Sequence, residues 1–177
     1  MKSLYRGDNY ALMADYNAWM NRKIYALAAE IPDAKRKQDL GAFFKSLHGT
    51  LNHILFADLI FLARFTGSPM PEGDFGSELY GDFGAMRAER KQIDGRILDW
   101  IANLDRKGLA EPLTFTSMID GKTRTLPRWV MLTQMFNHQT HHRGQATTLI
   151  KQLGVDPGTT DIPWLPALYS EAGVDAL

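Results

Sequence analysis

The chain has 177 residues, of which 45% are hydrophobic, and its 20 basic and 20 acidic residues give a formal net charge of zero. This length suits one domain with a substantial core, so we expect residues 1–177 to form a single domain. The balanced charge and the absence of a basic run exclude the pattern typical of nucleic-acid-binding or membrane-surface proteins. A small-molecule substrate is the better expectation.

Two further features predict a soluble, cytoplasmic protein. The N-terminus lacks the apolar core of a signal peptide, and the longest apolar run, residues 54–63, contains Asp58 and is too short to cross a bilayer. Cysteine is absent, which excludes disulfides, thiolate ligands and a cysteine nucleophile. If thiol chemistry takes place on this protein, the substrate must supply the sulfur.

Apolar residues that recur at helical spacing predict long helices in the first two thirds of the chain. By this criterion the first three helices cover about residues 9–30, 40–65 and 83–104. Asp8 or Asn9 is available to cap the first helix, and Asp39 to cap the second. Glycine and proline between residues 67 and 73 should end the second helix.

A β-hairpin and a fourth helix are predicted next. Residues 113–126 are rich in threonine and include Asp120-Gly121, a pair that favours a two-residue type I′ turn. Thr125 is a candidate cap for the fourth helix, Pro127 suits its first turn, and Gly154 suits its end. The proline-rich tail should pack as an irregular cover. We therefore expect an all-α protein, an antiparallel four-helix bundle with a short β-hairpin before the last helix.

The stretch "FNHQTHHRGQ", residues 136–145, holds three of the five histidines. His138 and His142 lie about 40° apart, one helical turn from each other, whereas His141 points about 100° away from His142. The pair shares its stripe with Met131 and Met135, so the apolar pattern places it toward the interior. Buried imidazoles need partners, and a shared metal ion would satisfy both. The alternative, that the spacing is a chance feature of a helix, stays open at this point.

A third ligand is expected from the second helix, which carries His48 and His53. These two lie about 140° apart, so only one of them can face the fourth helix. His53 has the small residues Gly49 and Ala57 one turn away on either side, which leaves room for an ion, and we select His53. Three imidazoles with an open position are typical of a catalytic metal site, which lowers the pKa of a bound water or thiol.

Other polar residues near the pair are assigned as follows. Position 139 is Gln where an HExxH zinc protease has its Glu, so the motif is not of that class. Gln145 lies one turn further on the same face and is the candidate catalytic residue, since it could hydrogen-bond a metal-bound water or the substrate; a structural amide is the alternative. Asp58 is expected to pair with an arginine, and Arg143 to form an ion pair or a dimer surface.

Three segments together carry a family resemblance. "YNAWMNRKI", "TLNHILFADLIFLARF" and "NHQTHHRGQ", in this order, resemble the DinB family of four-helix-bundle proteins over about residues 5–155. The resemblance implies that His53, His138 and His142 are the metal ligands and that the protein is a homodimer. The family is similar in fold to thiol-dependent transferases and isomerases that use bacillithiol, mycothiol or glutathione.

The leading hypothesis is therefore a divalent-metal-dependent transferase that acts with a low-molecular-weight thiol. A metal-dependent hydrolase and a non-catalytic metal-binding bundle are the alternatives. Zn or Ni is expected, and Fe or Co would also suit imidazole nitrogen. We expect the walls of the substrate pocket to come from Tyr16, Trp19, the proline-rich loops and the C-terminal cover.

Overall fold

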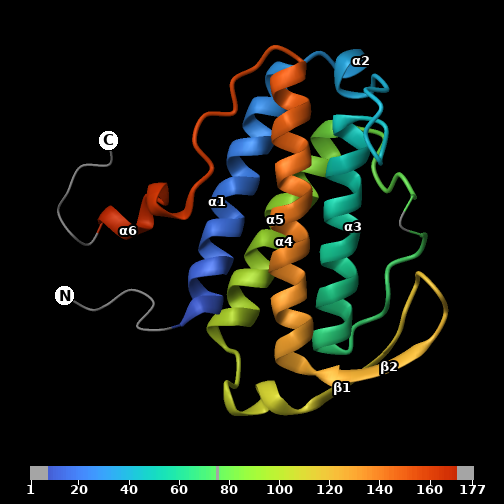
Figure 1. Ribbon diagram of the computed structural model, residues 1–177, viewed down its shortest axis with the longest axis vertical. Coiled ribbons are helices and arrows are strands. Elements are labelled where there is room, and N and C mark those ends of the chain that lie inside the picture. The colour runs from blue at the N-terminus through green and yellow to red at the C-terminus, as the bar shows by residue number, and fades with distance from the viewer. Residues whose placement is uncertain (1–7, 75, 171–177) are drawn as a thin grey trace.

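Helices make up most of the structure, a computed structural model that describes residues 8–74 and 76–170 (Figure 1). Four of the described helices are long: α1 (Asn9–Glu30), α3 (Leu47–Thr66), α4 (Phe83–Ala102) and α5 (Arg128–Gln152). The shorter elements are α2 (Asp33–Arg36), η1 (Lys107–Ala110), β1 (Pro112–Thr116), β2 (Thr123–Pro127), η2 (Ile162–Trp164) and α6 (Ala167–Ser170). The two strands pair antiparallel. The predicted mostly helical fold with a hairpin before the last long helix is confirmed.

Aspartate side chains cap α1 and α4. Asp8 accepts a hydrogen bond from the backbone N–H of Ala11 at 3.1 Å, which confirms one of the two predicted caps of α1. Asp82 accepts from the N–H of Ala85 at 2.7 Å and begins α4 in the same way. Both helices therefore begin where a side-chain acceptor satisfies a free N–H group.

Helix α3 begins at Leu47 and not near Leu40, so the predicted start is wrong. Asp39 does not cap a helix, because its carboxylate accepts a hydrogen bond from the N–H of Gly41 at 2.9 Å within a turn. Residues 42–44 are apolar and extend the helical spacing of α3 toward the N-terminus, which is why the pattern predicted too long a helix.

A tight turn before α3 replaces that extra helix. Ser46 caps α3 by accepting a hydrogen bond from the N–H of Gly49 at 3.0 Å, and Lys45 adopts a left-handed φ of 64°. A Cβ at Gly49 would lie 2.3 Å from the carbonyl oxygen of Phe44, so the turn approaches the helix closely only because position 49 is glycine. This approach brings Phe44 against the first turns of α3.

The turn of the hairpin also differs from the prediction. Residues 117–122 lie between the strands, so the connection is longer than a two-residue turn. Gly121 has a φ of 67°, but among the described residues Lys45 is the only non-glycine with positive φ. Asp120 therefore lacks the conformation that a type I′ turn requires. Its carboxylate instead pairs with Arg124 at 2.6 Å.

Helix α5 follows β2 without a connecting loop. Pro127 occupies the N-cap position, and the predicted cap Thr125 lies inside β2, where its hydroxyl is 2.9 Å from that of Thr114. Gly154 follows the helix with a φ of 88°, as predicted for a terminating glycine. Because β2 and α5 are continuous, the hairpin is tied directly to the helix that carries the histidine pair.

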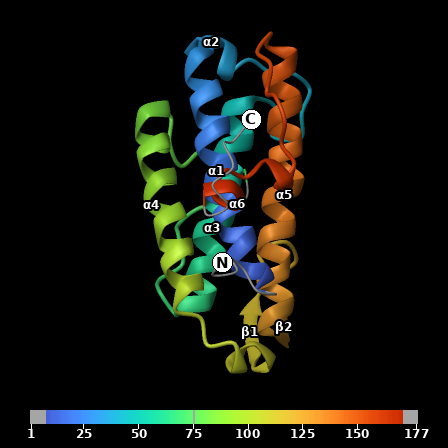
Figure 2. The ribbon, with the colours of Figure 1, turned by 90° about the vertical axis from the view of Figure 1, so that its left-hand side faces the viewer.

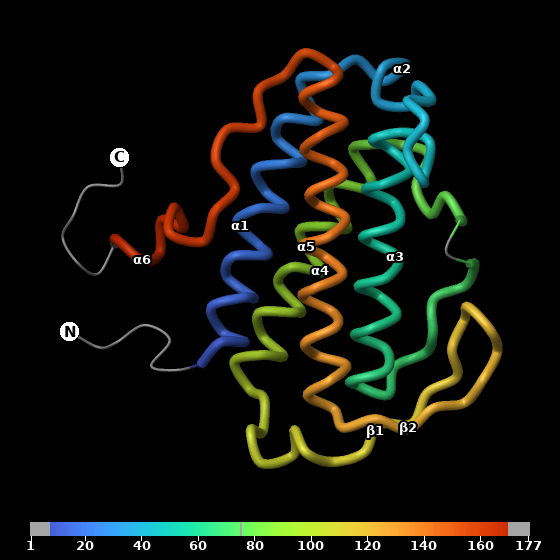
Figure 3. The backbone as a smooth tube through the Cα atoms, in the orientation of Figure 1, coloured from blue at the N-terminus to red at the C-terminus, as the bar shows by residue number. Residues whose placement is uncertain are grey.

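The four long helices pack side by side, with α1 and α3 each contacting both α4 and α5 (Figures 1 and 2). Asp58 pairs with Arg90, and Phe65 stacks on Trp100, so α3 and α4 run in the same direction. Helices α1 and α5 run the opposite way (Figure 3). Residues 67–74 and 76–82 must therefore return along the length of α3.

A buried polar network crosses the core and joins all four long helices. The carboxylates of Asp58 and Asp94 both pair with Arg90. Gln139 donates to Asp58 at 2.6 Å, and Asn21 donates to Asp94 at 2.8 Å. Burial raises the pKa of Asp94 to about 6, and the Arg90 charge opposes that rise. The prediction that Asp58 pairs with an arginine is confirmed.

The described part of the C-terminal tail contacts α1 and is irregular apart from η2 and α6, and the rest of the predicted cover, residues 171–177, lies outside the described residues. The hydroxyl of Tyr16 donates to the carbonyl of Thr160 at 2.6 Å, and Lys23 donates to the carbonyl of Thr159. None of the described helices has the length and apolar character needed to span a membrane.

Candidate metal centre

Three imidazoles from two helices meet at one point. His53 comes from α3, and His138 and His142 come from successive turns of α5. Nε2 of His53 lies 3.1 Å from Nε2 of His138 and 3.3 Å from Nε2 of His142, and the three potential ligand atoms all lie within 4.8 Å of one another. The structure thus brings together the three histidines selected from the sequence.

Hydrogen bonding alone does not account for this cluster. A ring nitrogen offers either one proton or one lone pair, so Nε2 of His53 cannot bond to both neighbours at once. Two ligands at the usual bond length from a tetrahedral zinc ion lie about 3.3 Å apart, close to the two distances from Nε2 of His53. Imidazole nitrogen also suits nickel, iron and cobalt. The donor set therefore fits a divalent transition-metal ion.

The surroundings keep the α5 histidines neutral, as metal ligands must be. Burial, followed by the neighbouring imidazoles, lowers the pKa of His138 to about 3. Burial also lowers the pKa of His142, although its hydrogen bond with Gln145 opposes that shift. Nδ1 of His142 lies 2.7 Å from Oε1 of Gln145. If that nitrogen donates its proton to the amide oxygen, the lone pair of Nε2 faces the cluster.

The two remaining histidines have other roles. His48 is buried with Nε2 2.8 Å from the carbonyl of Tyr80, so it holds the 67–82 connection against α3 and stays outside the cluster, as predicted. His141 is exposed and does not join the ligands, but its ring lies 4.7 Å from that of His142 and it lines the neighbouring cavity. Neither residue belongs to the three-histidine cluster of the described residues.

Arg143 lies in the core, which corrects the prediction of an ion-pair or dimer-surface residue. Its side chain is 3% exposed, donates to Asn17 of α1 and lies 5.3 Å from the Tyr16 ring. No salt bridge to it is found in the described part of the chain, and burial lowers its pKa to about 10. The reason is that position 143 faces α1, an element whose place the local pattern did not reveal.

Aromatic rings enclose the histidines. Phe44 stacks on His53 with ring centroids 3.8 Å apart and meets His142 edge-on at 5.6 Å, and Phe61 meets His138 at 6.1 Å. Phe44 was not predicted at the site, because the apolar pattern placed it inside a helix. The rings make the immediate surroundings of the cluster apolar.

A cavity of about 730 Å³ opens beside the histidines, within the size range of small-molecule sites. Its walls come from α3, α5, the hairpin and the turn before α3, and they are mostly apolar. The expected walls were wrong: among the described residues, Tyr16, Trp19, the proline-rich loops and the tail do not line it, and the tail contacts α1 instead. Gln145 lines the cavity, whereas Gln139 is turned toward Asp58.

The fold and the site define a mostly helical protein with a three-histidine cluster compatible with metal binding. Residues 3–172 match the DinB family, and the chain belongs to that family. Among its relatives, Protein DinB from Bacillus subtilis (strain 168) is 26% identical over 155 residues, which cover 83% of this chain and 87% of the relative. The resemblance drawn from three sequence segments is thereby confirmed.

Proposed function

We propose that this protein is a divalent-metal-dependent transferase that joins a small thiol to an electrophilic carbon of its substrate. The observation that carries the proposal is the convergence of three Nε2 atoms, from His53, His138 and His142, on the wall of an apolar cavity. In this proposal the long helices form a four-helix bundle, with antiparallel pairs α1–α4 and α3–α5, that holds the ligands in place. When bound, the ion lowers the pKa of a thiol or water at its open position.

The thiol gives its S–H proton to solvent, and its sulfur then forms a bond to the electrophilic carbon. The bond between that carbon and the leaving group breaks, and the leaving group departs with the electron pair of that bond. Because the chain has no cysteine, the sulfur comes from a co-substrate such as bacillithiol, mycothiol or glutathione. The apolar walls exclude water, which favours transfer to the sulfur over hydrolysis.

The residues around the ligands have positioning roles in this proposal. Gln145 fixes the ring orientation of His142 by accepting from its Nδ1, and the same amide lines the cavity, so Gln145 stays the predicted catalytic residue. A hydrolase is less well supported, since no Asp or Glu lines the cavity within the described ranges to serve as a general base.

Metal content tests the ligand set first. We expect near-stoichiometric metal, zinc or nickel, in untagged wild type and in His48→Ala and His141→Ala, measured by inductively coupled plasma mass spectrometry. The variants His53→Ala, His138→Ala and His142→Ala should lose it. Equal loss from the two control variants would contradict the assignment.

Thiol chemistry tests the activity. Cobalt-substituted protein should change its visible absorption when a thiol is added, and the metal-loaded enzyme should consume thiol with a panel of electrophiles such as monobromobimane. Metal binding that only raises the unfolding temperature, with neither effect, would instead support the non-catalytic alternative. The homodimer and the cytoplasmic location stay predictions, and light scattering tests the first of them.

A further inference from the structure

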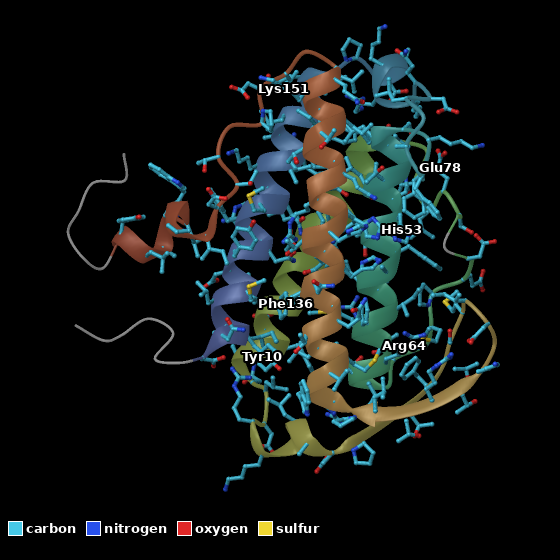
Figure 4. The ribbon with its side chains drawn as sticks, viewed as in Figure 1. Tyr10, His53, Arg64, Glu78, Phe136 and Lys151 are labelled. Carbon is cyan, nitrogen blue, oxygen red and sulfur yellow. The ribbon has the colours of Figure 1, made fainter. Side chains whose placement is uncertain are left out.

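The cavity beside the histidines extends along α3 to Arg64, which the proposed function does not use. His53 and Arg64 are eleven positions apart, so α3 turns them about 20° from each other and separates them by about 16 Å along its axis. Ala57 and Ile60 line the cavity between them. Figure 4 places both labelled residues on α3, with Arg64 nearer the hairpin. The cavity is therefore elongated, with imidazoles toward one end and a guanidinium toward the other.

Arg64 is a half-buried cation that forms no salt bridge with another described residue. No Asp or Glu lines the cavity in the part of the chain that the structure describes, and Arg64 is the charged side chain on its wall. Burial lowers the pKa of Arg64. The guanidinium nevertheless stays protonated at neutral pH, because arginine loses its proton only at far higher pH. Its partial desolvation is a cost that an anion would offset.

A structural role explains only part of the surroundings of Arg64. Nη2 donates to the carbonyl of Thr116 at 3.0 Å, and the guanidinium lies 4.6 Å from the Phe115 ring centroid, so the side chain helps to seat the hairpin on α3. That hydrogen bond uses a single N–H of a group that carries several. The donors that remain form a planar fork, which suits a carboxylate.

The remainder of the cavity is suited to an apolar molecule. Phe61, Leu126 and Met131 line it between the two ends. At its rim Phe43 and Ile119 are 85% and 87% exposed, and they come from two separate segments, the turn before α3 and the loop of the hairpin. Exposed apolar side chains around a cavity are typical of a surface that a ligand covers.

We propose that the cavity binds an elongated small molecule with an apolar body and a carboxylate, with the carboxylate against Arg64 and the opposite end at the histidine cluster. This inference rests on the proposed function only in assigning the reactive end to the histidines. The contact between Arg64 and the carboxylate does not require a metal ion, so it is measurable with and without one.

Calorimetry with decanoate, decanol and decylamine, below the concentrations at which they form micelles, tests the charge requirement. We expect decanoate to bind wild type about tenfold more tightly than decanol, and decylamine to bind more weakly than either, with zinc-loaded and chelator-treated protein alike. Arg64→Met should weaken decanoate about tenfold and leave decanol unchanged. Arg64→Lys should fall between them, because it keeps the charge and loses the fork. Arg96→Met, which removes an exposed arginine of α4, is the matched control.

Equal affinity of wild type for decanoate and decanol would overturn the inference, as would an equal effect of Arg64→Met on both ligands. If Arg64→Met fails to fold because the hairpin is released, the affinities of wild type for the three ligands and of Arg64→Lys for decanoate still test the inference. Failure of the proposed function is distinguishable: decanoate selectivity without thiol turnover would refute the transferase alone. Thiol turnover without decanoate selectivity would refute only the role of Arg64.

Discussion

Replacing Gln139 with Glu, which converts the motif to HExxH, should destabilise the protein at neutral pH and create no catalytic base. Gln139 is fully buried, and its Nε2 donates to Oδ1 of Asp58 at 2.6 Å, away from the cavity. A carboxylate at this position would face the carboxylate of Asp58 in the core. Because like charges at this distance disfavour ionisation, the introduced group must take up a proton to remain buried.

The magnitude follows from the cost of that proton. Keeping a carboxyl with an ordinary pKa of about 4.3 protonated costs about 1.4 kcal/mol per pH unit, or about 4 kcal/mol at pH 7. The introduced carboxyl has a higher pKa in the folded state than in the unfolded state. Above about pH 4.3 the folded state therefore binds more protons than the unfolded state, and the free energy of unfolding falls as the pH rises toward the folded-state pKa. Near pH 4.5 the protonated carboxyl can donate to Asp58 as the amide does, and the loss should be below about 1 kcal/mol.

Urea unfolding of chelator-treated protein near pH 4.5 and pH 7.5 measures this difference, about 4 kcal/mol between the two conditions. Gln139→Met is the control, since it removes the same hydrogen bond without adding a charge and should lose similar stability at both pH values. If Gln139→Glu is as stable as wild type at the higher pH, or is destabilised equally at both, the reasoning about Asp58 is refuted.

Four further predictions concern the metal, the residues around it and the core. Zinc at a hundred times its Kd should raise the free energy of unfolding by about 2.7 kcal/mol, measured by urea titration. Gln145→Leu should weaken zinc binding about 10- to 100-fold in competition with a chelating dye. Since burial raises the pKa of Asp94 to about 6, wild type should lose about 2 kcal/mol of stability relative to Asp94→Asn as pH rises from about 4 to about 6. Gly49→Ala should destabilise the protein by more than about 1 kcal/mol, detected by thermal unfolding, because the added methyl displaces Phe44.

The three-histidine cluster could be predicted from the sequence because it depends on the rigid geometry of single helices. A spacing of four places His138 and His142 on one face of α5. A spacing of five places His48 and His53 on different faces of α3, so only one of them can face α5. The structure adds only that these faces meet. Arg64 follows from the same helical geometry, since an offset of eleven from His53 returns it to the same face of α3.

What the sequence could not reveal depends on contacts between distant segments. Arg143 is buried because α1 lies beside α5, and the 67–82 connection is long because α4 runs parallel to α3. Phe44 reaches His53 because Gly49 admits a tight turn, where the apolar pattern alone favoured helix. In each case a local pattern was overridden by the packing of another element.

The cavity lies between two structural units, and that arrangement relates the metal site to Arg64. One unit is α5 together with the hairpin, since β2 passes into α5 without a loop; the other is α3. The histidine cluster joins these units at one place, and the hydrogen bond from Arg64 to Thr116 joins them again about three helical turns away. The separation between α3 and the hairpin therefore depends on both links. A metal ion at the histidine cluster and a ligand carboxylate at Arg64 would lie at opposite ends of the same cavity. Each would therefore affect the separation between α3 and the hairpin.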